Sequence, residues 1–210
     1  VSARACEFLG IKAEGTKMIT CHIGNGGSVA AVVDGKCIDT SMGLTPLEGL
    51  VMGTRSGDID GGAVTFLEKK LGLDADGMSN LLNKKSGVAG ITGGSSDMRD
   101  VENAAKAGEP RAQLAQAMYF YRIKKYIGAY AAAMGGVDVI VFTAGVGENQ
   151  VSMRSEVCKG LEFLGVKFDE AKNAVRGEEA VISADDSKVK VVVIPTDEEL
   201  MIATDTMNLL

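Results

Sequence analysis

One segment constrains the fold of this 210-residue chain more than any other. It is an almost wholly apolar, mainly β-branched run over residues 137–143 that continues directly into Ala-Gly-Val-Gly-Glu-Asn at 144–149. A run without polar alternation is typical of a strand buried on both faces of a sheet. A second such strand, Val189–Ile194, is broken by Pro195 and followed by a predicted helix to Leu210. The chain is therefore predicted to contain buried strands linked by helices, in an α/β domain.

Three shorter apolar runs precede these strands. They cover residues 17–22, 28–33 and 36–40, with Gly-Asn-Gly-Gly and Asp-Gly between them. Asp-Gly between β-rich runs is a strong hairpin pattern, so we expect an antiparallel three-stranded meander. The complete order predicts a mixed five-stranded sheet, β-β-β-α-β-α-β-α, with helices on both faces.

Helices are expected between the meander and the first buried strand. Asp60 can cap one of them, and Ser96 or Asp97 can cap another. We assign residues 169–188 to a peripheral helix and turn. The expected helices cover residues 62–71, 76–84, 97–107 and 111–134.

The charge balance argues against polyanionic partners. With 22 Lys and Arg against 28 Asp and Glu, the net charge is −6 at pH 7, which disfavours nucleic acid and anionic membranes. A small anion can still bind, because a local ring of backbone N–H groups does not depend on net charge. The most apolar window, Gly128–Gly147, is interrupted by Asp138, so we predict neither a membrane span nor a signal peptide.

Cysteine and histidine are too few and too scattered for the usual metal centres. The four cysteines form no C-x-x-C pair and His22 is the single histidine, so we expect reduced thiols and a cytoplasmic location. The chain begins with Val1 rather than Met. It is therefore either processed or a piece of something longer.

Two glycine-rich turns are candidate ligand sites. The turn Gly24–Gly27 is explained by a hairpin that needs positive φ, although its bare backbone could also approach phosphate oxygens. Gly145-Val146-Gly147 follows a buried strand and precedes a helix, an arrangement typical of sites that bind an anion or a nucleotide. It is not the dinucleotide motif G-x-G-x-x-G, because Gln150 stands at the sixth position.

Charged residues near other turns have a structural interpretation, and for some of them there is also a functional one. Arg55 either pairs with Asp58 or Asp60, or projects into a cleft to neutralise a phosphoryl group. Thr196 and Glu199 fit a capping box for the last helix.

Glu198 is not needed for that box. It either complements the helix dipole or holds Mg²⁺ beside a nucleotide. His22, which closes the first strand, is more simply a structural histidine than a catalyst.

Taken together, these segments resemble the acetate kinase family, within the acetate and sugar kinase, Hsp70 and actin superfamily. The resemblance spans nearly the whole chain and implies a ribonuclease H-like, actin-type ATPase fold. The long stretch around Arg55 is its most specific part. The segments that carry it are Cys21–Gly26, Asp39–Asp60, Ser95–Arg99, Phe142–Asn149 and Ile194–Glu199.

The resemblance implies a role for each candidate residue. Arg55 would stabilise the phosphoryl group during its transfer, and Glu198 would serve Mg²⁺. We expect Gly26, Arg55, Gly145 and Glu198 to border a common crevice. The residues that would line the site of ATP or ADP are His22, Ile23, Gly24, Asn25, Gly26, Asp97, Met98, Arg99, Gly145, Val146, Gly147, Glu148 and Asn149.

Two residues depart from the family pattern. Ile23 stands where Leu is usual, and Gly61 where Pro is expected. Neither change removes a functional side chain, although Gly61 could loosen the loop that carries Arg55.

The resemblance also implies that residues 1–210 are the carboxyl-terminal nucleotide-binding domain of an acetate kinase whose N-terminal domain is absent. The complete enzyme would transfer a phosphoryl group reversibly from ATP to acetate, giving acetyl phosphate and ADP. This chain alone should be inactive. Its expected partners are these small molecules, the N-terminal domain and a second copy in a homodimer. A propionate or butyrate kinase, a non-catalytic actin- or Hsp70-type module, and a Rossmann-type dehydrogenase are the alternatives.

Overall fold

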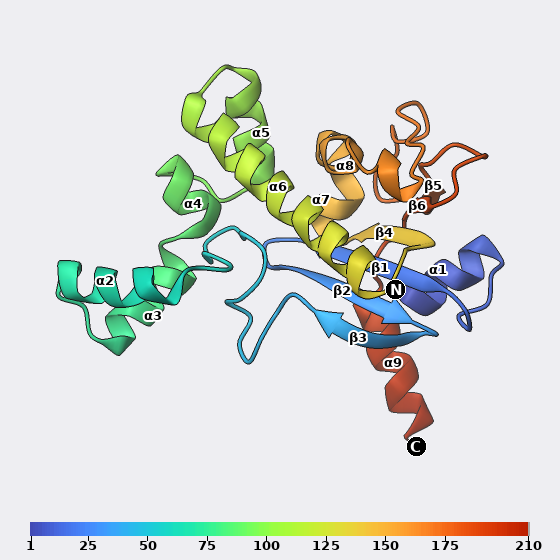
Figure 1. Ribbon diagram of the computed structural model, residues 1–210, viewed down its shortest axis with the longest axis horizontal. Helices are drawn as coiled ribbons and strands as arrows, with labels where there is room; N and C mark the ends of the chain where they lie inside the picture. The colour runs from blue at the N-terminus through green and yellow to red at the C-terminus, as the bar shows by residue number, and fades with distance from the viewer. Residues whose placement is uncertain (210) are drawn as a thin grey trace.

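Six strands form one mixed sheet in the order β3-β2-β1-β4-β6-β5 in the computed structural model, which describes residues 1–209 (Figure 1). β1 pairs antiparallel with β2, and β2 with β3, as the meander predicted. β4 lies between β1 and β6 and is parallel to both. The strands are β1 (Lys17–Ile23), β2 (Gly27–Val33), β3 (Lys36–Thr40), β4 (Val139–Thr143), β5 (Ala180–Val181) and β6 (Lys190–Val193).

The expected count of five strands is wrong because β5 was missed. β5 has two residues and pairs antiparallel with the edge of β6, Ala180 opposite Val193. A pair of residues carries no alternating pattern that sequence inspection could detect. The helix expected within 169–188 is also wrong, since the structure has turns, bridges and β5 there.

Helices cover both faces of the sheet, as predicted. The long helix α6 (Pro110–Ala133) crosses one face in Figure 1, and α8 (Val151–Cys158) packs beside it. α1 (Ser2–Leu9) covers the opposite face. Along β4, Ile140 and Phe142 join the core under α6, while Val139 and Val141 join the core under α1. β4 is therefore buried on both sides, which explains its unbroken apolar sequence.

The remaining helices confirm most of the expected positions. Asp60 caps α2 by accepting from the Gly62 N–H at 2.9 Å, and Asp97 caps α5 by accepting from the Arg99 N–H at 2.9 Å. α1 and α4 were not anticipated. The helices other than α1, α6 and α8 are α2 (Gly61–Leu71), α3 (Ala75–Lys84), α4 (Gly87–Thr92), α5 (Met98–Lys106), α7 (Ala144–Asn149) and α9 (Glu198–Asn208), with a 3-10 turn at Glu162–Leu164.

The capping box predicted for the last helix is wrong. Asp197, not Thr196, caps α9, and its carboxylate accepts from the Leu200 N–H at 3.0 Å. The Thr196 hydroxyl instead donates to Glu148 at 3.3 Å. α9 projects from the sheet in Figure 1, and none of its residues is buried. Leu210, where the helix was expected to end, lies outside the described residues.

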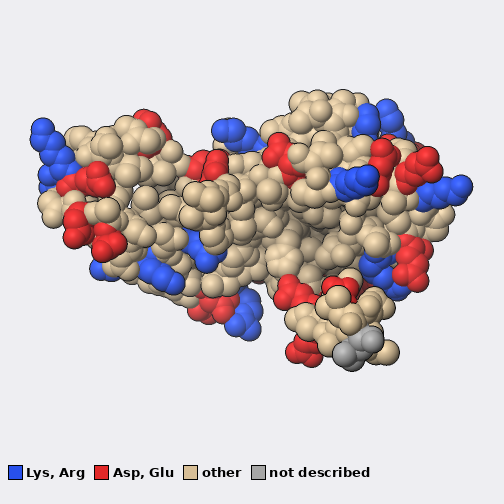
Figure 2. Space-filling model, turned by 90° about the horizontal axis from the view of Figure 1, so that it is seen from below, with Lys and Arg blue, Asp and Glu red and all other residues tan. Residues whose placement is uncertain are grey.

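The surface carries charges of both signs. Figure 2 shows basic and acidic side chains interspersed over the face in view, without a continuous basic area. Within residues 1–209, no helix combines the length and apolarity that a membrane crossing requires. The four cysteines are all unpaired, and three of them are buried.

The double-sided burial of β4 predicts a large effect of truncating its side chains. Ile140→Ala, at a fully buried position, should lower the free energy of unfolding by about 2–5 kcal/mol. The matched control, Ile38→Ala on β3, removes a side chain that is 56% exposed and should cost less than about 0.5 kcal/mol. Urea unfolding of both variants measures the difference. Equal losses would contradict this account of the core.

Candidate functional site

Three loops meet at one edge of the sheet because β1, β4 and β6 are parallel. Their carboxyl ends lead into Gly24, Ala144 and Ile194. The first two loops touch, since a methyl group placed on Gly24 would lie 3.7 Å from the Ala144 Cβ. In open α/β sheets, ligands bind at this edge.

Ala144 adopts a strained backbone conformation at the end of β4. Its φ is +64°, in the left-handed region that residues with a Cβ rarely occupy. Such strain costs about 1–3 kcal/mol and clusters at functional sites. It turns the chain sharply from β4 into α7, where a Cβ on Gly147 would lie 3.5 Å from the Phe142 carbonyl carbon.

A pocket of about 700 Å³ opens between this edge and α5, a size typical of small-molecule sites. Eight of its lining residues were predicted: Gly24, Asn25, Asp97, Met98, Arg99, Gly145, Val146 and Asn149. Six were not: Gly53, Ser96, Glu102, Tyr119, Gln150 and Arg176.

Other predicted residues lie near the pocket without lining it. Ile23 is buried in the core and His22 pairs with Ser28 and Thr143 within the sheet. Gly147 is buried in α7. The Glu148 carboxylate accepts from the Thr196 N–H at 3.0 Å, and so ties α7 to the segment before α9.

Of the four residues expected to border one crevice, only Gly145 lines this pocket. Gly26 and Arg55 contact each other beside it, since a Cβ on Gly26 would lie 3.3 Å from Arg55 Nη1. Their neighbours Asn25 and Gly53 do line it, and the Gly53 N–H donates to the Asn25 carbonyl at 3.1 Å. Glu198 is exposed, two residues beyond Thr196.

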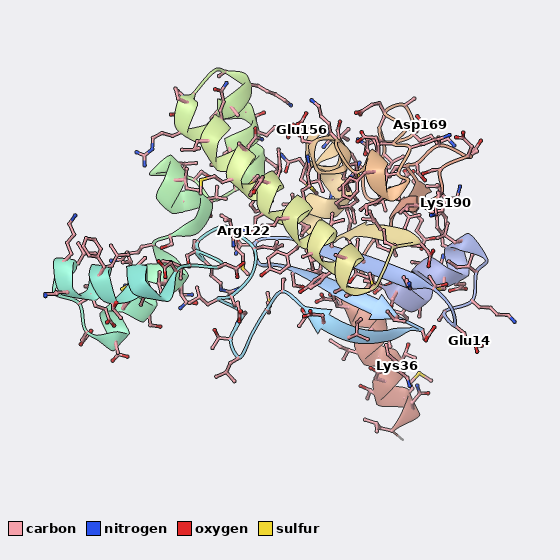
Figure 3. The ribbon with its side chains drawn as sticks, viewed as in Figure 1. Glu14, Lys36, Arg122, Glu156, Asp169 and Lys190 are labelled. Atoms are coloured by element: carbon pink, nitrogen blue, oxygen red, sulfur yellow. The ribbon has the colours of Figure 1, made fainter. Side chains whose placement is uncertain are left out.

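Arg55 pairs with neither Asp58 nor Asp60. The Asp58 carboxylate accepts from Arg122 Nη1 at 2.7 Å, from the Tyr126 hydroxyl at 2.9 Å and from the Gly49 N–H at 2.8 Å. Figure 3 labels Arg122 between α6 and this loop. Within residues 1–209, no carboxylate lies within ion-pairing distance of Arg55. Its half-buried guanidinium therefore remains available to an anion.

Asp97 and Arg99 form an exposed pair on the α5 wall of the pocket. Arg99 Nη2 lies 2.6 Å from Asp97 Oδ2, and hydrogen bonds from the Arg99 side chain and backbone lower the pKa of Asp97 to about 2. Both groups are therefore charged at neutral pH, and Asp97 also caps α5.

Arg154, which the sequence analysis did not single out, holds the loop at the end of β4. It is fully buried, and its guanidinium donates to the Gly147 and Glu148 carbonyls at 2.9 and 2.8 Å. It also donates to the Asn173 side chain and to the Asn173 and Val175 carbonyls. Burial lowers the pKa of Arg154 to about 10, so it stays protonated at neutral pH.

The pocket residues that were missed come from distant parts of the chain. Arg176 donates to the Asn149 carbonyl at 2.7 Å, and the Tyr119 hydroxyl lies 3.5 Å from the Gly24 carbonyl. Glu102 accepts from Ser152 and Lys106, each at 2.8 Å. Burial alone would raise the pKa of Glu102, but these hydrogen bonds lower it overall. Gln150 was visible in the sequence as the residue that breaks the dinucleotide motif, Ser96 as a possible helix cap, and Gly53 within the segment Asp39–Asp60.

The sheet order, with helices on both faces and a pocket that three glycines line between loops, defines an α/β ligand-binding domain on a mixed six-stranded sheet. The acetokinase family matches residues 1–204. The chain is 74% identical to the acetate kinase of Phocaeicola vulgatus over all 210 residues, which cover 53% of that protein. It superposes on the crystal structure of Porphyromonas gingivalis acetate kinase with a TM-score of 0.97 at 61% identity, covering 99% of this chain and 52% of that one.

A propionate kinase from Francisella tularensis is similar at 42% identity with a TM-score of 0.88, over 96% of this chain and 51% of that one. The chain belongs to the acetokinase family. It spans about half the length of the curated relatives it matches.

The Arg154 network predicts a strong dependence of stability on this side chain. Arg154→Met removes the donor shared by several buried carbonyls and should cost about 3 kcal/mol or more of unfolding free energy. The same substitution at Arg4, whose side chain is 47% exposed and pairs with Glu7 and Glu179, should cost less than about 1 kcal/mol. Guanidinium unfolding compares the two. A loss at Arg154 no greater than at Arg4 would show that the network does not hold the loop.

Proposed function

We propose that this chain is the carboxyl-terminal, nucleotide-binding domain of an acetate kinase. In the complete enzyme it takes part in reversible transfer of a phosphoryl group from ATP to acetate, giving acetyl phosphate and ADP. The observation that carries the proposal is the glycine-lined pocket at the carboxyl edge of the parallel strands, in a chain of this family.

The nucleotide occupies this pocket with its phosphates toward the glycines. Gly24, Gly53 and Gly145 line it without side chains, so phosphate oxygens can approach backbone N–H groups. Asp97, Met98 and Arg99 form the α5 wall on the adenosine side. His22, Ile23, Gly26, Gly147 and Glu148 position these loops from behind or beside the pocket.

Arg55 stabilises the transferring phosphoryl group. A carboxylate nucleophile is already anionic and needs little help from a base, so catalysis depends on positioning and charge neutralisation. Arg55 fits this role because it has a permanent charge, a forked donor set and no competing carboxylate among the described residues.

The chemistry of Glu198 fits a Mg²⁺ ion held largely by phosphates. Mg²⁺ is commonly bound through one or two carboxylates together with substrate phosphates and water. Glu198 is exposed, and the Thr196–Glu148 hydrogen bond keeps the segment before it against α7. When bound, the ion would neutralise phosphate charge.

The other half of the enzyme completes the site. The acid binds largely outside this chain, which is inactive alone, and the enzyme is a homodimer. The more similar relatives named above act on acetate, and the more distant one acts on propionate. Acetate is therefore the acid we propose.

Nucleotide binding can be tested on this chain by itself. Mg-ADP at ~100 times its Kd should stabilise the folded state by about 2.7 kcal/mol, measured by thermal unfolding. Inorganic phosphate at the same concentration serves as the control and should have no such effect. An unchanged melting temperature with Mg-ADP would mean that the pocket does not bind the nucleotide without the other half.

Arg55 can be tested in the full-length enzyme. Arg55→Ala should lower kcat on the order of 10²–10³-fold, as for loss of a transition-state donor. Arg55→Lys keeps the charge but loses the fork, and should recover only part of the rate. Trapping of acetyl phosphate with hydroxylamine measures both variants. Near-normal kcat in Arg55→Ala would reject the role of Arg55.

A further inference from the structure

Gln150 carries a buried amide without a hydrogen-bond partner at the wall of the pocket. The residue is 6% exposed, it lines the pocket, and neither Oε1 nor Nε2 has a partner among the described residues. A buried polar group left unpaired costs free energy. Such a group in a native structure calls for a specific explanation.

The backbone of Gln150 is fixed while its side chain is not. Its N–H donates to the Val146 carbonyl at 2.9 Å, and its carbonyl accepts from the Arg154 N–H at 3.3 Å. It occupies the N-cap position of α8, yet its side chain makes no cap hydrogen bond. Helix capping therefore does not explain the amide.

The surroundings of Gln150 differ from the glycine end of the pocket. Gly53 and Asn25 contact each other, and so do the loops of Gly24 and Ala144. Gln150 lies instead on the segment where Arg176 donates to Asn149 and Ser152 donates to Glu102. The half-buried Val146 and the buried Met98 line the same pocket and offer apolar surface. The charged side chains there are already paired, Arg99 with Asp97 and Glu102 with Lys106, and Arg176 binds the Asn149 carbonyl. Apolar surface beside an unpartnered carboxamide suits a flat heterocycle better than a phosphate.

We propose that Gln150 recognises the base of the bound nucleotide, and that it selects adenine. A carboxamide presents one donor beside one acceptor, and the edge of adenine presents an amino donor beside a ring-nitrogen acceptor. On the edge formed by N7 and the C6 substituent, hypoxanthine and guanine carry O6 in place of that amino group, so two acceptors, O6 and N7, would face the amide. Because both amide atoms are buried, the side chain must change its torsion angles to reach the base. The inference rests on the proposed nucleotide site.

The test compares ADP with inosine diphosphate, which replaces the amino group with oxygen. Calorimetric titration of the full-length protein with each Mg²⁺ complex gives two Kd values. The wild type should bind ADP about tenfold or more tightly than inosine diphosphate. Gln150→Met is close in volume but lacks the amide. It should raise the Kd for ADP about tenfold and change the Kd for inosine diphosphate less than about twofold, so that the ratio of the two Kd values approaches one. Gln113→Met, at an exposed position of α6 outside the pocket lining, should leave both values unchanged.

Each outcome decides between alternatives. If Gln150→Met weakens the binding of both nucleotides equally, Gln150 has a structural role and the inference is wrong. If it changes neither, the amide does not meet the base, and an enclosed water is the better explanation. If the wild-type protein binds neither nucleotide, the proposed function fails instead. Thermal unfolding of Gln150→Met should show unimpaired stability, because an unpaired buried amide has been replaced by an apolar group.

Discussion

The position of β4 between two parallel neighbours is the constraint on which the rest of the structure depends. Its backbone is paired on both edges and its side chains enter both cores, so the strand cannot shift or tilt independently. Parallel pairing sends the ends of β1, β4 and β6 to the same edge, and the loops there must accommodate each other. The left-handed backbone of Ala144 and the bare backbones of Gly24 and Gly147 follow from that crowding. The same small residues leave room for a ligand.

Side chains that bind backbone carbonyls and N–H groups hold the loops of the site in place. Loop peptides lack the partners that a sheet or helix supplies, and each buried one needs another. Asp58, with Arg122 and Tyr126, anchors the loop that carries Arg55, and Arg154 anchors the end of α7. Because Asp58 is already paired with Arg122, Arg55 has no carboxylate partner among the described residues. The loop is thus ordered by one arginine and leaves another available, which lowers the entropic cost of binding an anion.

Sequence reasoning succeeded where the structure is set by local pattern. The meander, the two buried strands and the Asp60 and Asp97 caps depend on residues a few positions apart. It failed where the local structure depends on contacts between segments that are far apart in the sequence. β5 exists because β6 offers a free edge, and the Thr196 hydroxyl binds Glu148, 48 residues away, rather than capping α9. The position of Gln150 was visible, but its burial beside the pocket wall depends on how α5, α7 and α8 pack together.

The structure divides the proposed site into an end that this chain completes and an end that it leaves open. The proposed base end has the apolar Val146 and Met98, paired charged side chains and a buried amide, all supplied by described residues. The phosphoryl end has Arg55 beside the glycine loop, and Glu198 at the start of α9, a helix with no buried residues and several exposed apolar ones. Since the curated relatives are about twice as long, the proposed division of labour is physically reasonable. Under the proposed function, base selectivity would be built into this half, whereas charge neutralisation at the transferring phosphoryl group would require both halves to approach each other.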